Sequence, residues 1–232
     1  MGRRGRIVSY RISGAAPQAA ADHGAPIFPC WGFTRTAITI YVLKLAERGR
    51  ADLDACLPDS ATLDSYRQAV ARDEEPWPRE VLPGAAMRQG CPLPSGTGWA
   101  CSNIGCMLAR KHIEAVSQRP FPVLFKALIG DAPGLQGIEP ATAREDFARV
   151  HWPVARRCHP GRVYHGCLTG TAADAARLLH GRFAGRVASH SGGGPFCVNA
   201  VYHVPDRPDP VTVACFADDI DEGRAEFAAR CA

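Results

Sequence analysis

The stretch Phe28-Pro-Cys-Trp-Gly-Phe-Thr-Arg-Thr36 stands directly before an amphipathic helical pattern. The residues after it place apolar side chains at the spacing of one helix face, at Ile38, Val42 and Leu45. Basic residues suit the C-terminal end of a helix, and Gly49 supplies a stop. The pattern therefore predicts a helix from Thr34 to Arg48, with Arg35 in its first turn and Gly32 just before it.

Two further short segments are Trp99-Ala-Cys-Ser-Asn103 and His190-Ser-Gly-Gly-Gly194. Together with the first stretch, they resemble the three active-site boxes of the β-lactamase/D-alanyl-D-alanine carboxypeptidase-like serine hydrolases. Those boxes read Ser-x-x-Lys, Tyr-x-Asn or Ser-x-Asn, and Lys-Thr-Gly or His-Ser/Thr-Gly. The resemblance covers roughly residues 28–230. It implies an α+β fold, in which a reduced antiparallel sheet is flanked by helices and carries an inserted helical lobe.

The resemblance also implies which residues stand at the reactive positions. In the family a serine attacks a carbonyl, and a lysine one turn later accepts the proton of the serine. In this chain the serine position is Gly32 and the lysine position is Arg35. The tyrosine position is Cys101, while Asn103 is retained. Glycine has no nucleophile and arginine keeps its proton, so the usual acyl-enzyme chemistry is not expected.

The third segment implies one wall of a ligand site. Its glycines would let a substrate approach the backbone of a strand edge. The alternative is a glycine turn that leads into the next strand. We expect catalytic roles for Cys101, Asn103 and His190. We expect substrate-binding roles for Gly32, Arg35, Ser191, Gly192 and Gly193.

No substitute for the missing box occurs elsewhere in the sequence. None of the nine serines has a lysine three residues later. A thiol is the remaining nucleophile: Cys30 or Cys101 could act with His190 as base. The alternative is that both cysteines are buried small residues that fill space.

Soft metal ligands gather in one segment, as Cys158-His159 and His165-Gly-Cys167. Their spacing matches none of the common zinc patterns. The ten cysteines show no tight disulfide framework and are expected to stay reduced. The sequence therefore predicts no metal and no cofactor.

Composition limits the partners and the compartment. Hydrophobic residues at 46% and charged residues at 22% are typical of a globular protein. The net charge of +4, without a long Lys/Arg block, argues against nucleic-acid binding. No apolar run reaches the roughly 20 residues of a membrane span, and the basic start precedes no apolar segment. We therefore expect a cytoplasmic protein that binds neither nucleic acid nor membrane. The arginine-rich composition suggests a GC-rich, actinobacterial genome.

The remaining pattern predicts a single domain over residues 1–232, with the helical lobe over 50–185. The expected strands are 5–13, 196–204 and 211–217, and the further helices are 102–118, 172–184 and 221–230. Residues 76–98 are expected to form a loop because they are rich in proline and glycine. A shortened chain before the third segment would leave a sheet edge unpaired, which favours a homodimer.

Three functions remain open from the sequence. In the first, a repurposed cleft binds a small acyl, amide or polycyclic molecule and performs non-hydrolytic chemistry in specialised metabolism. Arg35 would hold an anion or carbonyl there, with Asn103 and His190 as hydrogen-bonding partners. The second is a residual esterase or amidase that uses a thiol or bound water. The third is a non-catalytic pseudoenzyme with a partial cleft.

Overall fold

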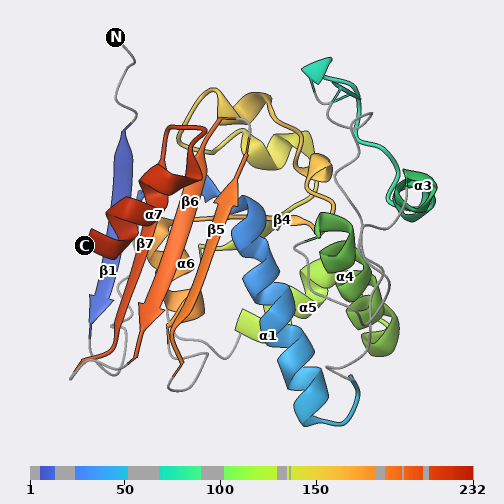
Figure 1. Cartoon of the computed structure of the whole chain (residues 1–232), viewed down its shortest axis with the longest axis horizontal. Coiled ribbons are helices and arrows are strands. Elements are labelled where there is room, and N and C mark those ends of the chain that lie inside the picture. The colour runs from blue at the N-terminus through green and yellow to red at the C-terminus, as the bar shows by residue number, and fades with distance from the viewer. Residues whose placement is uncertain are drawn as a thin grey trace.

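The computed structural model describes residues 6–13, 24–51, 68–69, 71–89, 102–129, 135, 137–180, 186–194, 196–205 and 209–231. Two antiparallel sheets and several helices make up this part of the chain (Figure 1). The expected α+β class with an antiparallel sheet flanked by helices is confirmed.

The larger sheet has four strands in the order β1, β7, β6, β5. These are β1 (Ile7–Ser13), β7 (Val211–Ala217), β6 (Val198–Val204) and β5 (Ala188–Gly193). All neighbours are antiparallel. Every residue of β7 is buried, as its run of Val, Ala and Phe favours for a central strand. At the other end of the order, β5 forms an edge of this sheet and carries the His190 segment.

Helices cover both faces of the larger sheet, as Figure 1 shows with α7 in front and α6 behind. Helix α7 (Glu222–Cys231) buries Ala225 and Ala229 against β6 and β7. Helix α6 (Ala172–Leu179) belongs to the main apolar cluster on the opposite face. Among the helices in the described ranges, none is long and apolar enough to cross a lipid bilayer.

The first sequence segment, residues 28–36, begins in a smaller sheet. It has the order β2 (Phe28–Pro29), β4 (Cys167–Gly170), β3 (Glu139–Ala141). The ring of Phe28 stacks on Phe216 of the larger sheet, with centroids 4.7 Å apart. This contact joins the two sheets. The chain then turns through the short 3-10 helix η1 (Trp31–Phe33) into helix α1 (Thr34–Glu47).

Further helices of the described part of the chain lie on the α1 side of the molecule (Figure 1). They are α3 (Val81–Gln89), α4 (Asn103–Ser117) and α5 (Phe121–Ile129). The Ser102 hydroxyl caps α4 by accepting the Gly105 N–H at 2.9 Å, so the second sequence segment ends at a helix start. Short 3-10 turns, η2 (Arg144–Phe147), η3 (Ala155–Arg157) and η4 (Pro160–Arg162), connect β3 to β4.

The predicted elements at 34–48, 102–118, 211–217 and 221–230 are confirmed to within two residues at each end. Thr171 and Asp174 form a capping box at the start of the helix expected over 172–184. Helix α6 however ends at Leu179, because His180 has an extended ψ of 126°.

The loop expected over 76–98 is wrong for α3. Pro83 is compatible with this helix because it lies in the first turn, where its missing N–H has no partner to lose. The fully buried Leu82 then holds the helix in place. The expectation of a loop relied only on the proline and glycine content of residues 76–98, which does not exclude a short helix.

The start of α1 is tied to β4 by one side chain, which leads to a first prediction. The buried Thr34 hydroxyl accepts the Leu168 N–H at 3.0 Å. Thr34→Val keeps the shape and leaves that N–H without an acceptor, so the free energy of unfolding should fall by about 1–3 kcal/mol. Urea denaturation measures the change. Thr34→Ser, which keeps the hydroxyl, should lose less; equal losses in both variants would contradict the hydrogen-bond explanation.

Candidate functional site

The three sequence segments meet in space. Arg35, in the first turn of α1, donates a hydrogen bond from Nη2 to Oδ1 of Asn103, the first residue of α4. The His190 segment arrives from the edge strand β5. A Cβ built on Gly32 would lie 3.3 Å from Cε1 of His190. The structure therefore brings Gly32, Arg35, Asn103 and His190 into one region of the molecule.

The backbone of β5 lies directly against Gly32. A Cβ on Gly32 would be 3.1 Å from both the Gly192 Cα and the Ser191 carbonyl oxygen. In the other direction, a Cβ on Gly192 would be only 2.6 Å from the Gly32 nitrogen. Both groups are backbone and cannot rotate away. Position 32 is therefore closely packed as well as lacking a nucleophile.

The other glycines of the third segment also face protein atoms. A side chain on Gly194 would meet the ring of Trp31, and one on Gly193 would meet the Glu222 carboxylate. Trp31 has a φ of 39°, an uncommon conformation for a residue with a side chain. Its indole N–H points to Cys197 Sγ at 3.2 Å. The glycines thus let η1 pack tightly on the end of β5.

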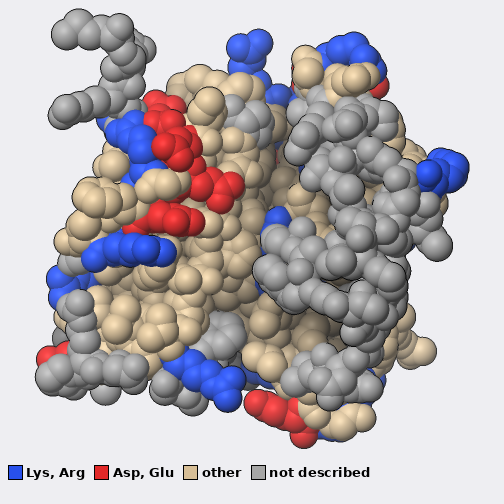
Figure 2. Space-filling model, in the orientation of Figure 1, with Lys and Arg blue, Asp and Glu red and all other residues tan. Residues whose placement is uncertain are grey.

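The side of the site near Arg35 is more open. Arg35, His190 and Ser191 are half-buried, and Asn103 is exposed. Figure 2 shows that this face of the molecule is hollowed along a furrow beside the sheet, with Lys or Arg atoms inside it. The Arg35 guanidinium and the Asn103 amide are therefore more accessible to solvent than Gly32 is.

Both histidines of the site are neutral at physiological pH. Burial, reinforced by the positive charge of Arg35, lowers the pKa of His190 to about 4. The same two causes lower the pKa of His165 to about 3. A neutral imidazole can accept as well as donate a hydrogen bond. The site therefore combines one permanent cation with two uncharged rings.

His165 was missed as a site residue by sequence reasoning, which considered it only as a weak metal ligand. Its ring is 2% exposed, and Nε2 lies 3.3 Å from the Trp31 carbonyl oxygen. Arg110 of α4 holds its backbone by donating from Nη1 to the His165 carbonyl at 3.4 Å. The available sequence signal was its place in Tyr164-His-Gly166, within a stretch that resembles the serine-hydrolase family.

Of the two candidate thiols, Cys30 and Cys101, the described residues include only Cys30. Cys30 is fully buried, and burial raises the pKa of its thiol well above the usual range. A protonated, buried thiol is a poor nucleophile, which favours the interpretation of Cys30 as a space-filling residue. Cys101 lies outside the described residues.

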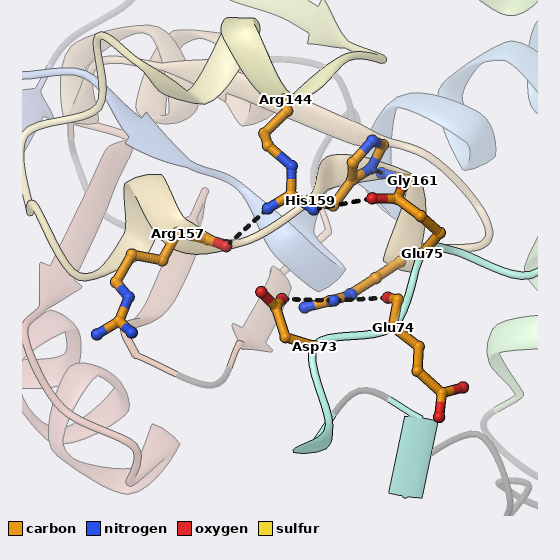
Figure 3. A network of polar contacts seen from close by, with 8 residues as sticks. Asp73, Glu74, Glu75, Arg144, Arg157, His159 and Gly161 are labelled. Carbon is orange, nitrogen blue, oxygen red and sulfur yellow. Dashed lines mark hydrogen bonds and ion pairs between the residues drawn. The ribbon is translucent and has the colours of Figure 1, made fainter.

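In the segment 158–167, which carries the soft metal ligands of the sequence, the side chains of His159 and Cys167 contact other groups of the protein. His159 accepts the Gly161 N–H at Nδ1 at 2.9 Å, and Arg144 and Arg162 bind the acidic residues 73–75 beside it (Figure 3). Cys167 donates to the Leu168 carbonyl at 3.3 Å. Within the described part of the chain, no three His, Cys, Asp or Glu side chains are placed to hold a metal ion.

Solved structures show what the chain is similar to. The D-stereospecific amidohydrolase from a Streptomyces species has a TM-score of 0.70 at 17% identity, over 97% of this chain and 93% of its own. The D-amino acid amidase from Ochrobactrum anthropi SV3 has a TM-score of 0.69 at 15% identity, over 97% and 95%. The octameric penicillin-binding protein homologue from Pyrococcus abyssi has a TM-score of 0.65 at 13% identity, over 88% and 65%.

These likenesses show that the chain has the β-lactamase/transpeptidase fold, the fold implied by the three segments. No protein-family model matches the chain, and no curated protein matches its sequence.

The close packing at position 32 predicts a graded effect of added methyl groups. Gly192→Ala should lower the free energy of unfolding most, because its Cβ would be 2.6 Å from backbone nitrogen. Gly32→Ala should lower it by about 1–3 kcal/mol, the usual range for overpacking. Urea denaturation of both variants tests this order.

The matched control is Gly84→Ala in α3, where the nearest atom to the new Cβ would be 3.6 Å away. Alanine also favours a helix interior over glycine, so this variant should be as stable as the parent or more so. Unchanged stability of Gly32→Ala would contradict the closure of position 32.

The neutral histidines predict a pH dependence of stability. Their folded pKa values, about 3 for His165 and about 4 for His190, lie below the ordinary 6.5 of an exposed ring. As pH falls below 6.5, the unfolded chain binds protons that the folded chain refuses, so stability decreases. Each histidine contributes at most about 1.4 kcal/mol per pH unit.

Urea denaturation between pH 4.5 and 7.5 measures this slope. His165→Gln and His190→Gln should each flatten it, whereas His112→Gln, at an exposed position on α4, should leave it unchanged. A slope that is the same in all four proteins would show that the two rings are not held neutral.

Proposed function

We propose that the cleft around Arg35, Asn103 and His190 binds a small organic molecule and does not form an acyl-enzyme. The observation that carries this proposal is the hydrogen bond from Arg35 to Asn103, beside a closely packed Gly32. The polar groups of the former reaction centre are still assembled. What has gone is the space and the chemistry for a nucleophile.

The residues present argue against acyl-enzyme hydrolysis in three ways. Gly32 offers no hydroxyl, and a serine there would press on the backbone of Gly192. Arg35 cannot accept a proton at working pH. His190, with a pKa of about 4, is a weak base at neutral pH.

The same residues suit recognition of an oxygen acceptor. The planar guanidinium of Arg35 can bind both oxygens of a carboxylate, and it also donates well to a carbonyl. Asn103 lies at the exposed end of this pair and offers an amide donor. A small acid or amide would therefore meet two donors beside Arg35 and Asn103.

The solved structures with this fold suggest suitable probes. The Ochrobactrum amidase is seen with L-phenylalanine, D-phenylalanine and L-phenylalanine amide. We extend this to the present chain only as a choice of ligand size and type. Amino-acid derivatives and simple aromatic acids are the first compounds to test.

The cellular location, the cofactor requirement and the oligomeric state of the protein are also parts of the proposal. We place the protein in the cytoplasm, acting without metal or cofactor in specialised metabolism. A homodimer through an edge of the larger sheet, and a helical lobe over residues 50–185, also stay predictions.

Calorimetric titration with 3-phenylpropanoate, D-phenylalanine and phenylalanine amide tests the proposal. At least one probe should bind, and Arg35→Ala and Asn103→Ala should each weaken it about tenfold, or about 1.4 kcal/mol. Arg48→Ala, an exposed arginine at the end of the same helix, is the control and should change nothing.

Two results would contradict the proposal in different ways. Turnover of a p-nitrophenyl ester that disappears in Cys101→Ala would indicate a thiol hydrolase. Absence of both binding and turnover would indicate a non-catalytic pseudoenzyme.

A further inference from the structure

The two edges of the larger sheet are covered differently. At β5, η1 packs on the strand backbone, since a Cβ on Gly192 would be 2.6 Å from the Gly32 nitrogen. At the other end of the order, β1 pairs with β7, and the described ranges give it no second strand. Edge strands offer backbone N–H and C=O groups to an added strand. Of the two edges, β1 is therefore the one that a further chain can extend.

An apolar groove lies beside this edge, between β1 and α7. In Figure 1, α7 crosses in front of β7 and its C-terminal end lies toward β1. The groove, called the β1–α7 groove below, is lined by Ile7, Asp221, Gly223, Arg224, Phe227 and Ala228. Phe227 is 72% exposed and Ile7 is 43% exposed. Large apolar side chains that share one exposed groove mark an interaction site, whereas single exposed ones are common on any surface.

Phe227 lies on the side of α7 that faces away from the sheet. The side that faces the sheet buries Ala225 and Ala229 against β6 and β7. Phe227 is two residues from each alanine, which is about 200° around an α-helix. Small residues inside and an aromatic ring outside reverse the usual pattern of an amphipathic helix. The packing of α7 on its own sheet therefore does not account for Phe227, and a contact from outside would.

The two ends of β1 differ in charge. The acidic turn before α7, residues 218–222, begins beside the Ile7 end, because the Asp218 N–H donates to the Arg6 carbonyl at 2.9 Å. Arg11 lies toward the other end of the strand and on the same face as Ile7, since side chains alternate along a strand. Figure 2 shows Lys or Arg atoms and Asp or Glu atoms side by side on the face that carries α7. This edge therefore carries both signs of charge, as a contact between identical surfaces requires.

Antiparallel pairing of two copies of β1 brings these opposite charges together. About a two-fold axis, the Ile7 end of each strand lies against the Ser13 end of the other. Arg11 of each copy then faces the acidic turn and the β1–α7 groove of the other. Parallel pairing would instead place the acidic turns beside each other. The charges therefore favour a second copy of this chain in the antiparallel arrangement.

The groove suits an arginine side chain. Ile7 and Phe227 offer an apolar wall to the methylene stem, and the aromatic ring can also hold the guanidinium. The Asp221 carboxylate lines the same groove and can pair with the charge. Arg224, the cation that already lines the groove, is paired with Asp219 of its own chain.

We infer that the β1–α7 groove is the interface for a second copy of this chain: β1 pairs antiparallel with its counterpart, and Arg11 of each copy enters the groove of the other. The two larger sheets then form one continuous sheet. This inference rests on the homodimer of the proposed function and assigns its surface. It does not depend on ligand binding at Arg35.

Analytical ultracentrifugation of the full chain tests the surface. The parent should sediment as a dimer in the micromolar range. Phe227→Lys should raise the Kd of the dimer by about tenfold or more, because it removes the apolar wall and repels Arg11. Val154→Lys, at a 45% exposed valine outside the groove, is the matched control and should leave the Kd unchanged. Circular dichroism should show that both variants stay folded.

A double-mutant cycle tests the pairing of Arg11 with Asp221. Arg11→Gln removes the cation, and Asp221→Asn removes the carboxylate charge but keeps Oδ1, which accepts the Gly223 N–H at 3.0 Å. Each variant should raise the Kd about tenfold. The double variant should be hardly weaker than either single one, because each change already breaks the same contact. Arg48→Gln, at an exposed arginine at the end of α1, should change nothing.

Amide hydrogen exchange followed by NMR tests the strand pairing. Every second amide of β1 points away from β7, and these amides should be protected in the dimer. They should exchange quickly in Phe227→Lys at concentrations where it is a monomer. The β1 amides that bond to β7 are the internal reference and should stay protected in both proteins.

The outcomes separate this inference from the proposed ligand site. A monomer throughout the micromolar range overturns the inference, and so does a dimer whose Kd is unchanged by Phe227→Lys and Arg11→Gln. Protection of the outward β1 amides in the monomer would show that another part of the same chain covers the edge, which also overturns it. A dimer with unprotected outward amides overturns the strand pairing. Binding of the acids at Arg35 should be the same in Phe227→Lys and the parent, so its absence would overturn the ligand site and leave the interface standing.

Discussion

The close approach of η1 to the end of β5 is the contact on which the site depends. Gly32 and Gly192 meet backbone to backbone, and the ring of Trp31 covers Gly194. Such an approach is open only to glycine, because any Cβ would meet atoms that cannot move. The contact leaves little room for a side chain at position 32 and brings His190 beside Gly32. The electrostatics of the site follow from it.

Burial is the main cause of the low pKa values of the His165 and His190 imidazoles, and the charge of Arg35 adds to it. Both His165 and His190 are therefore neutral, and Arg35 supplies the positive charge. Among the described residues of this region, Gly32 offers no nucleophile, Arg35 cannot accept a proton, and His190 is a weak base at neutral pH. The region keeps donors and acceptors in defined places, which is what recognition of a small polar molecule requires.

Sequence reasoning could place the three segments together, since their order and chemistry match a known set of boxes that converge in one fold. It could also predict α1 and the capped start of α6, where local signals such as the Thr171 box decide. It could not predict the packing of Gly32 on Gly192, which depends on tertiary contacts between distant segments. His165 was not identified as a site residue for the same reason. Its partner, the Trp31 carbonyl oxygen, is a backbone atom, and its position cannot be read from the sequence.

The central claim is our proposal that this chain, with its β-lactamase-type fold, keeps a polar site and does not form an acyl-enzyme. Intact-protein mass spectrometry after incubation with a fluorophosphonate and with a β-lactam tests it most directly, with an active serine hydrolase as positive control. The mass of this protein should stay unchanged with both reagents. A stoichiometric adduct that maps to η1, α1 or β5 would contradict the claim.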